Sequence, residues 1–397
     1  MEATAKRLPR EGRARQKTAA LFAPAIPTLT PQMLLPRKRR AAAPFPFDDP
    51  ATHWFYFARN GIYSLARLWG LAGREVLFPA YFHGVELEAL LEAGVRPKFF
   101  PVHDRMRVDP QEVIDRIGPD TKAVYLIHYL GFPGPVEEIA AACRERNVLL
   151  IEDCALALLS SAGEKPLGTT GDASIFCLYK TLPVPNGGAV VLRRGPPLGL
   201  PTGAPPPLAS TVAPILSSLL QTLEIHGGVA GRTVRNAVRT VGNAASRAAR
   251  AERVPTGTQH FDRSHVGLSM SGISHVIAEA QDFAGIVERR RRNYFHLLGR
   301  LRSVSPPVFG ELPPGVCPLF YPLQIRDKQA VLARLAARGI EAVDFWRVGH
   351  PALPPGSFPE VDRMRQTILE IPCHQDLSPA TVDRIAAAVA EVAEEVK

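Results

Sequence analysis

Cysteine is scarce in this sequence, and its distribution argues against two classes of protein. The 397-residue chain has five cysteines, an odd number, and they do not show the spacing of metal ligands. A secreted disulfide framework needs paired cysteines, and a structural zinc site needs clustered ones. We therefore expect reduced thiols, a cytoplasmic location and no metal site.

Long apolar runs are also missing. No stretch approaches the roughly 20 residues of a membrane-spanning helix, and the basic N-terminus lacks the apolar segment that follows it in a secretory signal. The net charge of +9 would suit nucleic acid or anionic lipid. Much of the excess lies in residues 1–40 and 231–253, however, so we expect no nucleic-acid partner.

From about residue 50, short apolar runs alternate with helical patterns. This alternation predicts an α/β fold with a mostly parallel central sheet, helices on both of its faces, and a smaller α+β region at the C-terminus. The predicted strands are residues 75–78, 98–100, 123–127, 148–151, 174–178, 188–192 and 320–325. The predicted helices are 61–71, 84–93, 110–116, 136–146, 213–223, 232–250, 270–302, 328–338 and 379–395.

Composition divides the chain into three parts. Residues 1–45 are basic, contain several prolines and are predicted to form a disordered tail. Residues 46–290 form the predicted large domain, which carries a basic helical insertion at about 195–260. Residues 291–397 form the predicted small domain.

The second helix of the insertion is amphipathic, with Arg232, Arg235 and Arg239 on one face and valines opposite. Such a helix can lie on an anionic membrane. It can equally pack on its own protein and leave the arginines in solvent. Both interpretations remain open, and the first would give a peripheral membrane contact through the insertion.

Three segments carry residues suited to one chemistry. Asp153 ends an apolar strand, and an aspartate that faces a pyridine nitrogen keeps that nitrogen protonated; a loop or helix-capping aspartate is the alternative. Lys180, one of only nine lysines, follows another apolar strand. Lysine forms imines with carbonyl compounds, although a surface lysine is the simpler alternative. The segment 59–64 opens a helix, whose free N–H groups can bind phosphate.

His83 lies in an aromatic cluster, 79–84, that follows a predicted strand. Its flat ring could stack on a planar cofactor, but a histidine in a loop is more often structural.

Taken in order, these segments resemble the DegT/DnrJ/EryC1/StrS family of pyridoxal-phosphate (PLP) dependent sugar aminotransferases. The resemblance runs from about residue 59 to 188, resumes near 268 and continues to the C-terminus. Late signals include the segments 338–341 and 358–361, and the segment 369–374 is similar to the family's Leu-Ser-Leu-Pro-x-His element. The resemblance implies the PLP-dependent transferase fold of type I, that of aspartate aminotransferase.

The same resemblance implies roles for individual residues. Lys180 would be the Schiff-base lysine and proton shuttle, Asp153 the partner of the pyridinium nitrogen, and His83 the ring stacked on the cofactor. The other positions implied are the phosphate-binding turn Gly61, Ile62 and Tyr63, the phosphate-binding hydroxyl position at Cys177 or Ser174, and Asn186 in the glycine-rich stretch after the lysine. The activity implied is transfer of an amino group from a donor such as glutamate to a keto-sugar, usually nucleotide-linked, by a homodimer with shared active sites.

The sequence departs from the family pattern at several of these positions. Leu156 stands where the family usually has Gln or His, Ile62 replaces the threonine of the phosphate turn, and the loop that leads to Lys180 is shortened. Relatives that dehydrate sugars have histidine at the lysine position, so Lys180 favours transamination. The alternative is a degenerate member that binds PLP or a partner without turnover.

Overall fold

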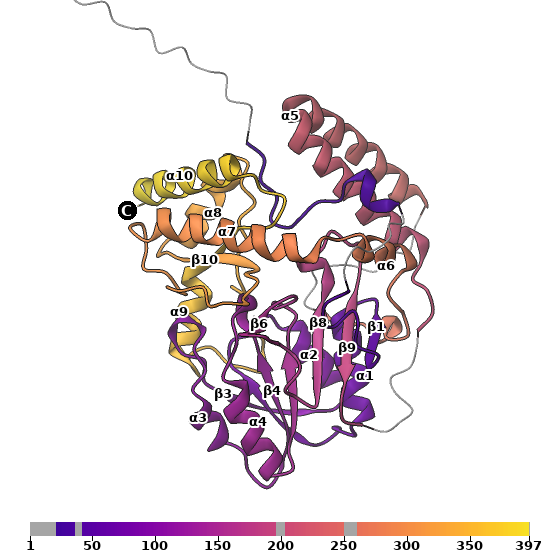
Figure 1. Cartoon of the computed structure of the whole chain (residues 1–397), viewed down its shortest axis with the longest axis vertical. Coiled ribbons are helices and arrows are strands. Elements are labelled where there is room, and N and C mark those ends of the chain that lie inside the picture. The colour runs from indigo at the N-terminus through magenta and orange to yellow at the C-terminus, as the bar shows by residue number, and fades with distance from the viewer. Residues whose placement is uncertain (1–20, 36–41, 196–202, 250–259, 397) are drawn as a thin grey trace, which may run out of the picture.

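A seven-stranded sheet forms the centre of the computed structural model, which describes residues 21–35, 42–195, 203–249 and 260–396 (Figure 1). The strand order is β1-β9-β8-β5-β4-β2-β3. Strand β9 is antiparallel to both of its neighbours, and the other adjacent pairs are parallel. The strands are β1 (Thr52–Phe55), β2 (Glu75–Pro79), β3 (Arg96–Phe100), β4 (Thr121–Ile127), β5 (Leu149–Asp153), β8 (Ala173–Cys177) and β9 (Gly188–Leu192).

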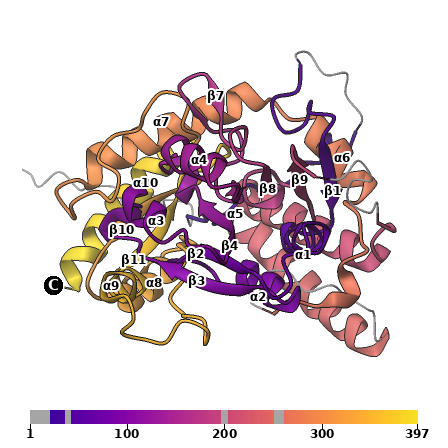
Figure 2. The same cartoon turned by 90° about the horizontal axis from the view of Figure 1, so that it is seen from below.

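Helices cover both faces of this sheet, as predicted. Helix α1 (Ala58–Leu68) packs on β8 and β9, α4 (Val136–Glu145) packs on β5, and the two helices lie on opposite sides of the sheet (Figure 2). Because both faces are covered, β5 and β8 are buried along their whole length. The remaining elements of this part are α2 (Val85–Glu92), α3 (Pro110–Ile114) and the short hairpin of β6 (Ser161–Ala162) and β7 (Lys165–Pro166).

The C-terminal part contains a two-stranded antiparallel sheet and four helices. Its strands are β10 (Phe320–Gln324) and β11 (Ile368–Pro372), and its helices are α7 (Phe283–Leu301), α8 (Lys328–Ala337), α9 (Pro359–Thr367) and α10 (Pro379–Glu395). The predicted domain boundary near residue 290 falls within α7. There the buried Arg290 donates to the carbonyl oxygens of Leu319 and Thr181, at 2.8 and 3.3 Å, so this side chain links the two parts.

The prediction of a single helix over residues 270–302 is wrong. The structure has two helices, α6 (Gly272–Glu279) and α7, separated by residues 280–282. Asp282 caps α7, because its side chain accepts a hydrogen bond from the backbone N–H of Gly285 at 3.0 Å. An aspartate favours this position since it satisfies one of the free N–H groups of a helix start.

Part of the predicted disordered tail is ordered. Residues 1–20 and 36–41 lie outside the described residues, but residues 21–35 run across the molecule. Ala23 pairs with Ile340, the N–H of Thr28 donates to Asp376 at 2.7 Å, and the N–H of Leu29 donates to Ser218 at 2.7 Å. Ala23 and Leu29 are fully buried. Apolar residues within a basic segment therefore anchor it, against our prediction.

The insertion forms α5 (Leu208–Ala249), whose first arm (208–227) and second arm (229–249) correspond to the two predicted helices, 213–223 and 232–250. Gly228 breaks it with a non-helical conformation, φ 54° and ψ −127°. Arg232 and Arg235, two of the arginines on the predicted basic face, form ion pairs with Glu224 at 2.7 and 3.0 Å. Glu224 lies before Gly228, so these ion pairs join the two arms of α5. Arg235 also lies over the ring of Phe22. These arginines are thus engaged within the protein, which weakens the membrane interpretation.

Within the described residues, one helical segment is long and apolar enough to cross a membrane by length and composition. It is Leu208–Val238, within α5. We expect no transmembrane segment, and this expectation stays a prediction. The finding is weak evidence of a membrane span, since helices of soluble proteins pass the same test, and the break at Gly228 lies inside the segment.

Candidate active site

Lys180 stands where two elements of the large sheet approach each other. It ends a short 3-10 helix, Leu178–Lys180, directly after β8. The N–H of Leu178 bonds to the carbonyl of Gly187 at 2.9 Å, which ties the start of this turn to the segment before β9. A side chain at Gly188 would clash with the backbone of Phe57 and Ala58, so glycine there lets α1 approach β9. Lys180 is half-buried and lines a cavity.

Asp153 is the last residue of β5 and lines the same cavity. Its Oδ2 accepts a hydrogen bond from the Tyr125 hydroxyl at 2.7 Å, and its Oδ1 accepts one from the N–H of Ala155 at 2.8 Å. Burial raises the pKa of Asp153 to about 6, and Glu86 acts in the same direction, whereas Tyr125, Ala155 and the charge of Lys180 oppose the rise. The carboxylate therefore lies within electrostatic reach of Lys180.

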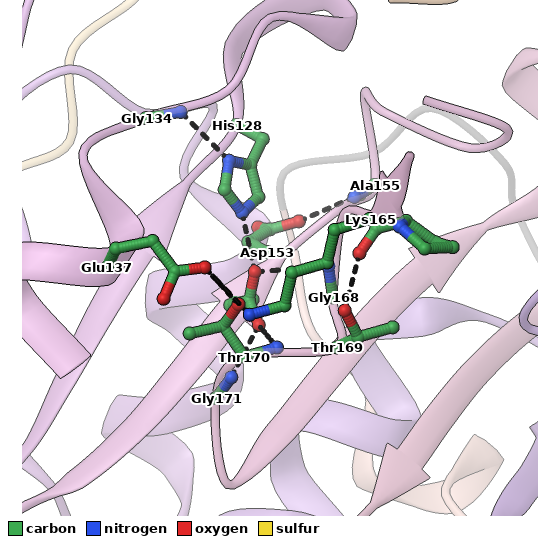
Figure 3. A network of polar contacts seen from close by, with 12 residues as sticks. His128, Gly134, Glu137, Asp153, Ala155, Lys165, Gly168, Thr169, Thr170 and Gly171 are labelled. Carbon is green, nitrogen blue, oxygen red and sulfur yellow. Dashed lines mark hydrogen bonds and ion pairs between the residues drawn. The ribbon is translucent and has the colours of Figure 1, made fainter. Parts of the chain in front are cut away.

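A fully bonded network beneath the site fixes the end of β5. Glu152 accepts hydrogen bonds from His128 at 2.9 Å and from the N–H groups of Gly168, Thr170 and Gly171 at 3.0, 2.8 and 2.5 Å. His128 accepts from Gly134 through its other ring nitrogen, as Figure 3 shows. His128, Glu152 and Cys154 are close enough together to hold a metal ion. However, both ring nitrogens of His128 and both oxygens of Glu152 already have partners, so the cluster is structural.

The cavity has a volume of about 510 Å³ and is lined by both parts of the chain. The sheet part contributes Lys180, Asp153, His83, Ile62 and Cys177, and the C-terminal part contributes residues 343–348 and Glu370. This volume lies in the range of small-molecule sites. The predicted residues on separate strands thus converge at one edge of the sheet, as expected for a parallel α/β fold.

His83 lies at one wall of the cavity and is half-buried. Burial lowers its pKa to about 4, and the charges of Lys180, Arg59 and Arg365 act in the same direction. Its backbone N–H donates to Glu86 at 2.8 Å, at the start of α2. The imidazole is therefore neutral near pH 7, which suits a ring that lies against an aromatic ligand.

The predicted phosphate turn is only partly at the cavity. Ile62 lines it, but Gly61 packs against Val190 and Phe55, and the Tyr63 ring stacks on Phe261 at 5.3 Å. Helix α1 begins at Ala58, three residues before the predicted start. The first turn of the helix therefore begins at Ala58 and Arg59, and both residues line the cavity.

Of the two candidate positions for a phosphate-binding side chain, only Cys177 lines the cavity. Ser174 does not line the cavity. Its Oγ lies next to Gly168, since a Cβ atom added to that glycine would be 3.0 Å from it. Asn186 is fully buried elsewhere. It bonds to the N–H and hydroxyl of Ser271 at 2.9 and 3.0 Å and thereby anchors the start of α6.

Several charged residues that line the cavity had no predicted role, among them Arg59 and Glu370. Arg59 is buried, with its guanidinium 3.8 Å from the centre of the Phe57 ring. Glu370 is also buried and comes from β11. Glu370 lies within the Leu369–His374 segment that carries part of the family resemblance, but the pattern gave no sign that it would line the same cavity as Lys180. Burial raises the pKa of Glu370 to about 8, which the charges of Lys180 and Lys328 moderate.

Comparison with curated proteins finds sugar aminotransferases. The chain is 39% identical over 119 residues to dTDP-4-dehydro-2,3,6-trideoxy-D-glucose 4-aminotransferase of Saccharopolyspora spinosa, covering 29% of this chain and 31% of that protein. It is 31% identical over 122 residues to GDP-perosamine synthase of Vibrio cholerae, covering 30% and 33%. The matched segment thus spans about a third of the length of these relatives.

Solved structures share the fold over nearly the whole chain. PseC of Helicobacter pylori, an aminotransferase involved in the biosynthesis of pseudoaminic acid, superposes with a TM-score of 0.65 at 16% identity and covers 94% of this chain and 99% of its own. The putative sugar aminotransferase Spr1654 of Streptococcus pneumoniae, in its PLP form, gives 0.64 at 15% identity and covers 96% and 100%. The model of the DegT/DnrJ/EryC1/StrS aminotransferase family matches residues 63–195. This segment, about a third of the chain, is therefore similar to the DegT/DnrJ/EryC1/StrS aminotransferase family.

Proposed function

We propose that this protein is a PLP-dependent aminotransferase that moves an amino group from an amino acid such as glutamate to a nucleotide-linked keto-sugar. The observation that supports this most is the meeting of Lys180 and Asp153, from the ends of two strands, in one cavity. An amine that can react with an aldehyde and a buried carboxylate that can face a ring nitrogen are the two groups that PLP chemistry requires.

The residues present fit PLP. Asp153 forms no ion pair among the described residues, and burial raises its pKa, so a protonated ring nitrogen facing it would stabilise its ionised form. Neutral His83 suits contact with the flat ring. At the start of α1, the positive end of the helix dipole and the Arg59 guanidinium suit the phosphate. When bound, PLP supplies an aldehyde and an electron sink for carbanion chemistry.

The remaining chemistry falls to Lys180. Released from the cofactor, its amine holds and moves a proton at the substrate carbon, as acid and base in turn. The half-buried Lys180 lines the cavity together with the buried Asp153 and residues 343–348. Tyr125 and Ala155 orient the Asp153 carboxylate through one hydrogen bond to each oxygen.

The substrate class comes from the relatives, whose names specify dTDP-, GDP- and UDP-linked sugars. We accordingly propose a role in sugar or cell-surface polysaccharide biosynthesis. We also propose a cytoplasmic enzyme, in accord with five free cysteines, and a homodimer with shared active sites, to be tested by light scattering of the purified protein.

Absorbance of the purified protein with added PLP tests the proposal. We expect a cofactor band that disappears in Lys180→Ala but persists in Lys165→Ala, because Lys165 lies on the surface in an ion pair with Glu137. Glutamate should shift the band, and a nucleotide-linked keto-sugar should restore it. If the wild-type protein shows no such band, the proposal that it is a PLP-dependent enzyme is refuted. A band that glutamate leaves unchanged would instead indicate a member that binds PLP without turnover.

A further inference from the structure

Glu370 is a buried carboxyl group that the proposed chemistry leaves unused. It lies in the middle of β11, and its backbone pairs with Val343 through hydrogen bonds of 2.9 and 3.0 Å. It lines the same cavity as Lys180 and Asp153, and the residue is 3% exposed. Its Oε1 makes no hydrogen bond with any described residue. A buried polar atom without a partner costs free energy, so its presence in a ligand cavity calls for an explanation.

The cations near Glu370 do not provide that partner. Lys328 acts on the pKa of Glu370 through its charge, but the three N–H groups of its ammonium are engaged by the carbonyls of Phe345 and Arg365 and by Asp344, at 3.0, 2.8 and 2.7 Å. Lys180, the other cation that acts on Glu370, is the residue to which we assign the cofactor. A ligand in the cavity is then the natural partner of the carboxyl group.

The chemistry of a carboxyl group restricts what that partner is. Two substrates use the cavity in turn, an amino acid and a keto-sugar. In its ionised form a carboxyl group repels the carboxylate groups of glutamate, and in either protonation state it forms hydrogen bonds with hydroxyl groups. The keto-sugar is the substrate that carries hydroxyl groups next to the reacting carbonyl.

We propose that Glu370 recognises the amino acceptor, by hydrogen bonding to a sugar hydroxyl group near the carbonyl that is aminated. This inference rests on the proposed function and adds a specificity-determining residue to it. The family element that this segment resembles has serine in place of Glu370. The chain therefore has a longer, ionisable group at a position where the family pattern has a short hydroxyl.

A pair of acceptors that differ in hydroxyl groups tests the inference. dTDP-4-dehydro-6-deoxy-D-glucose has hydroxyl groups at carbons 2 and 3, and dTDP-4-dehydro-2,3,6-trideoxy-D-glucose has neither. We expect wild-type enzyme to prefer the first in kcat/KM, and Glu370→Ala to lose about tenfold of that preference, the size of one good buried hydrogen bond. Glu370→Gln, which can still accept a hydrogen bond, should keep most of it. Glu391→Gln, on the exposed face of α10, is the matched control.

Two further measurements separate the possible outcomes. Titration calorimetry with the two aminated product sugars should show the same loss of discrimination in Glu370→Ala without any turnover. The half-reaction with glutamate, followed by cofactor absorbance, should change less than about threefold, since it involves no sugar. An unchanged preference between the two sugars, or equal losses in both half-reactions, would overturn the inference. Wild-type enzyme that reacts with glutamate but with neither sugar also overturns it, and leaves the cofactor and donor chemistry intact. Wild-type enzyme that does not react with glutamate refutes the proposed aminotransferase, and the inference with it.

Discussion

Glu152→Gln should destabilise the fold strongly, although Glu152 does not line the cavity. The wild-type carboxylate accepts two hydrogen bonds on each oxygen, from Thr170 and Gly171 on Oε1 and from His128 and Gly168 on Oε2. A glutamine amide has one oxygen, so in either orientation its NH₂ group faces two donors. Two charge-assisted hydrogen bonds are lost, at about 1.5–3 kcal/mol each, and we expect the free energy of unfolding to fall by about 3–6 kcal/mol.

Urea unfolding followed by circular dichroism measures this loss. The control is Glu137→Gln, which removes an exposed ion pair with Lys165 and should cost no more than about 1 kcal/mol. Burial alone would raise the pKa of Glu152, but the bonds from His128, Gly171 and Gly168 hold it below its usual 4.5. The stabilisation is therefore present above pH 4.5 and is lost as the pH falls below it, and this acid dependence should diminish in Glu152→Gln. A variant that unfolds within 1 kcal/mol of wild type would refute the reasoning.

Three further changes probe the site and its supports. Tyr125→Phe removes the hydroxyl hydrogen bond that lowers the pKa of Asp153, so PLP affinity should fall about fivefold to tenfold, as measured by equilibrium titration. Asn186→Ala breaks the bonds to Ser271 and should destabilise the fold by about 1–3 kcal/mol in urea, with PLP affinity per folded molecule unchanged. His83→Ala should weaken PLP binding while His83→Phe retains it. Since the fold lowers the pKa of His83, its protonation in the unfolded chain makes wild type less stable as the pH falls below 6.5, and neither variant should show this contribution.

Much of the sheet could be predicted from the sequence because its strands are continuous apolar runs bounded by turn residues. Strands β2, β4 and β9 begin and end within two residues of the prediction. The edge strand β1 and the strand β11 were missed, since neither has such a run. The break at Gly228 in α5 falls between the two helices that periodicity predicted, 213–223 and 232–250.

The candidate site divides in the same way. Lys180 and Asp153 could be predicted because each ends a buried strand, and the ends of neighbouring strands meet at one edge of a sheet. Arg59 and Glu370 could not, because their places depend on where α1 begins and on how β11 packs against the large sheet. Ser174 does not reach the cavity because side chains alternate along a strand. Ser174 and Cys177 therefore lie on opposite faces of β8, and only the face of Cys177 meets the cavity.

The buried Glu370 should lower the stability of the fold at neutral pH, because its Oε1 has no hydrogen-bond partner among the described residues. The fold raises the pKa of Glu370 from 4.5 to about 8, so the protein loses stability as the pH rises between these values, and the wild type carries this cost at neutral pH. Glu370→Gln has no such titration and should be more stable than wild type at pH 8, by an amount that shrinks towards pH 5. Urea unfolding at both pH values measures the difference. A cavity residue that lowers stability is one that function maintains. If Glu370→Gln changes stability equally at both pH values, the carboxyl group already has its hydrogen-bond partners within the fold and this reasoning is refuted.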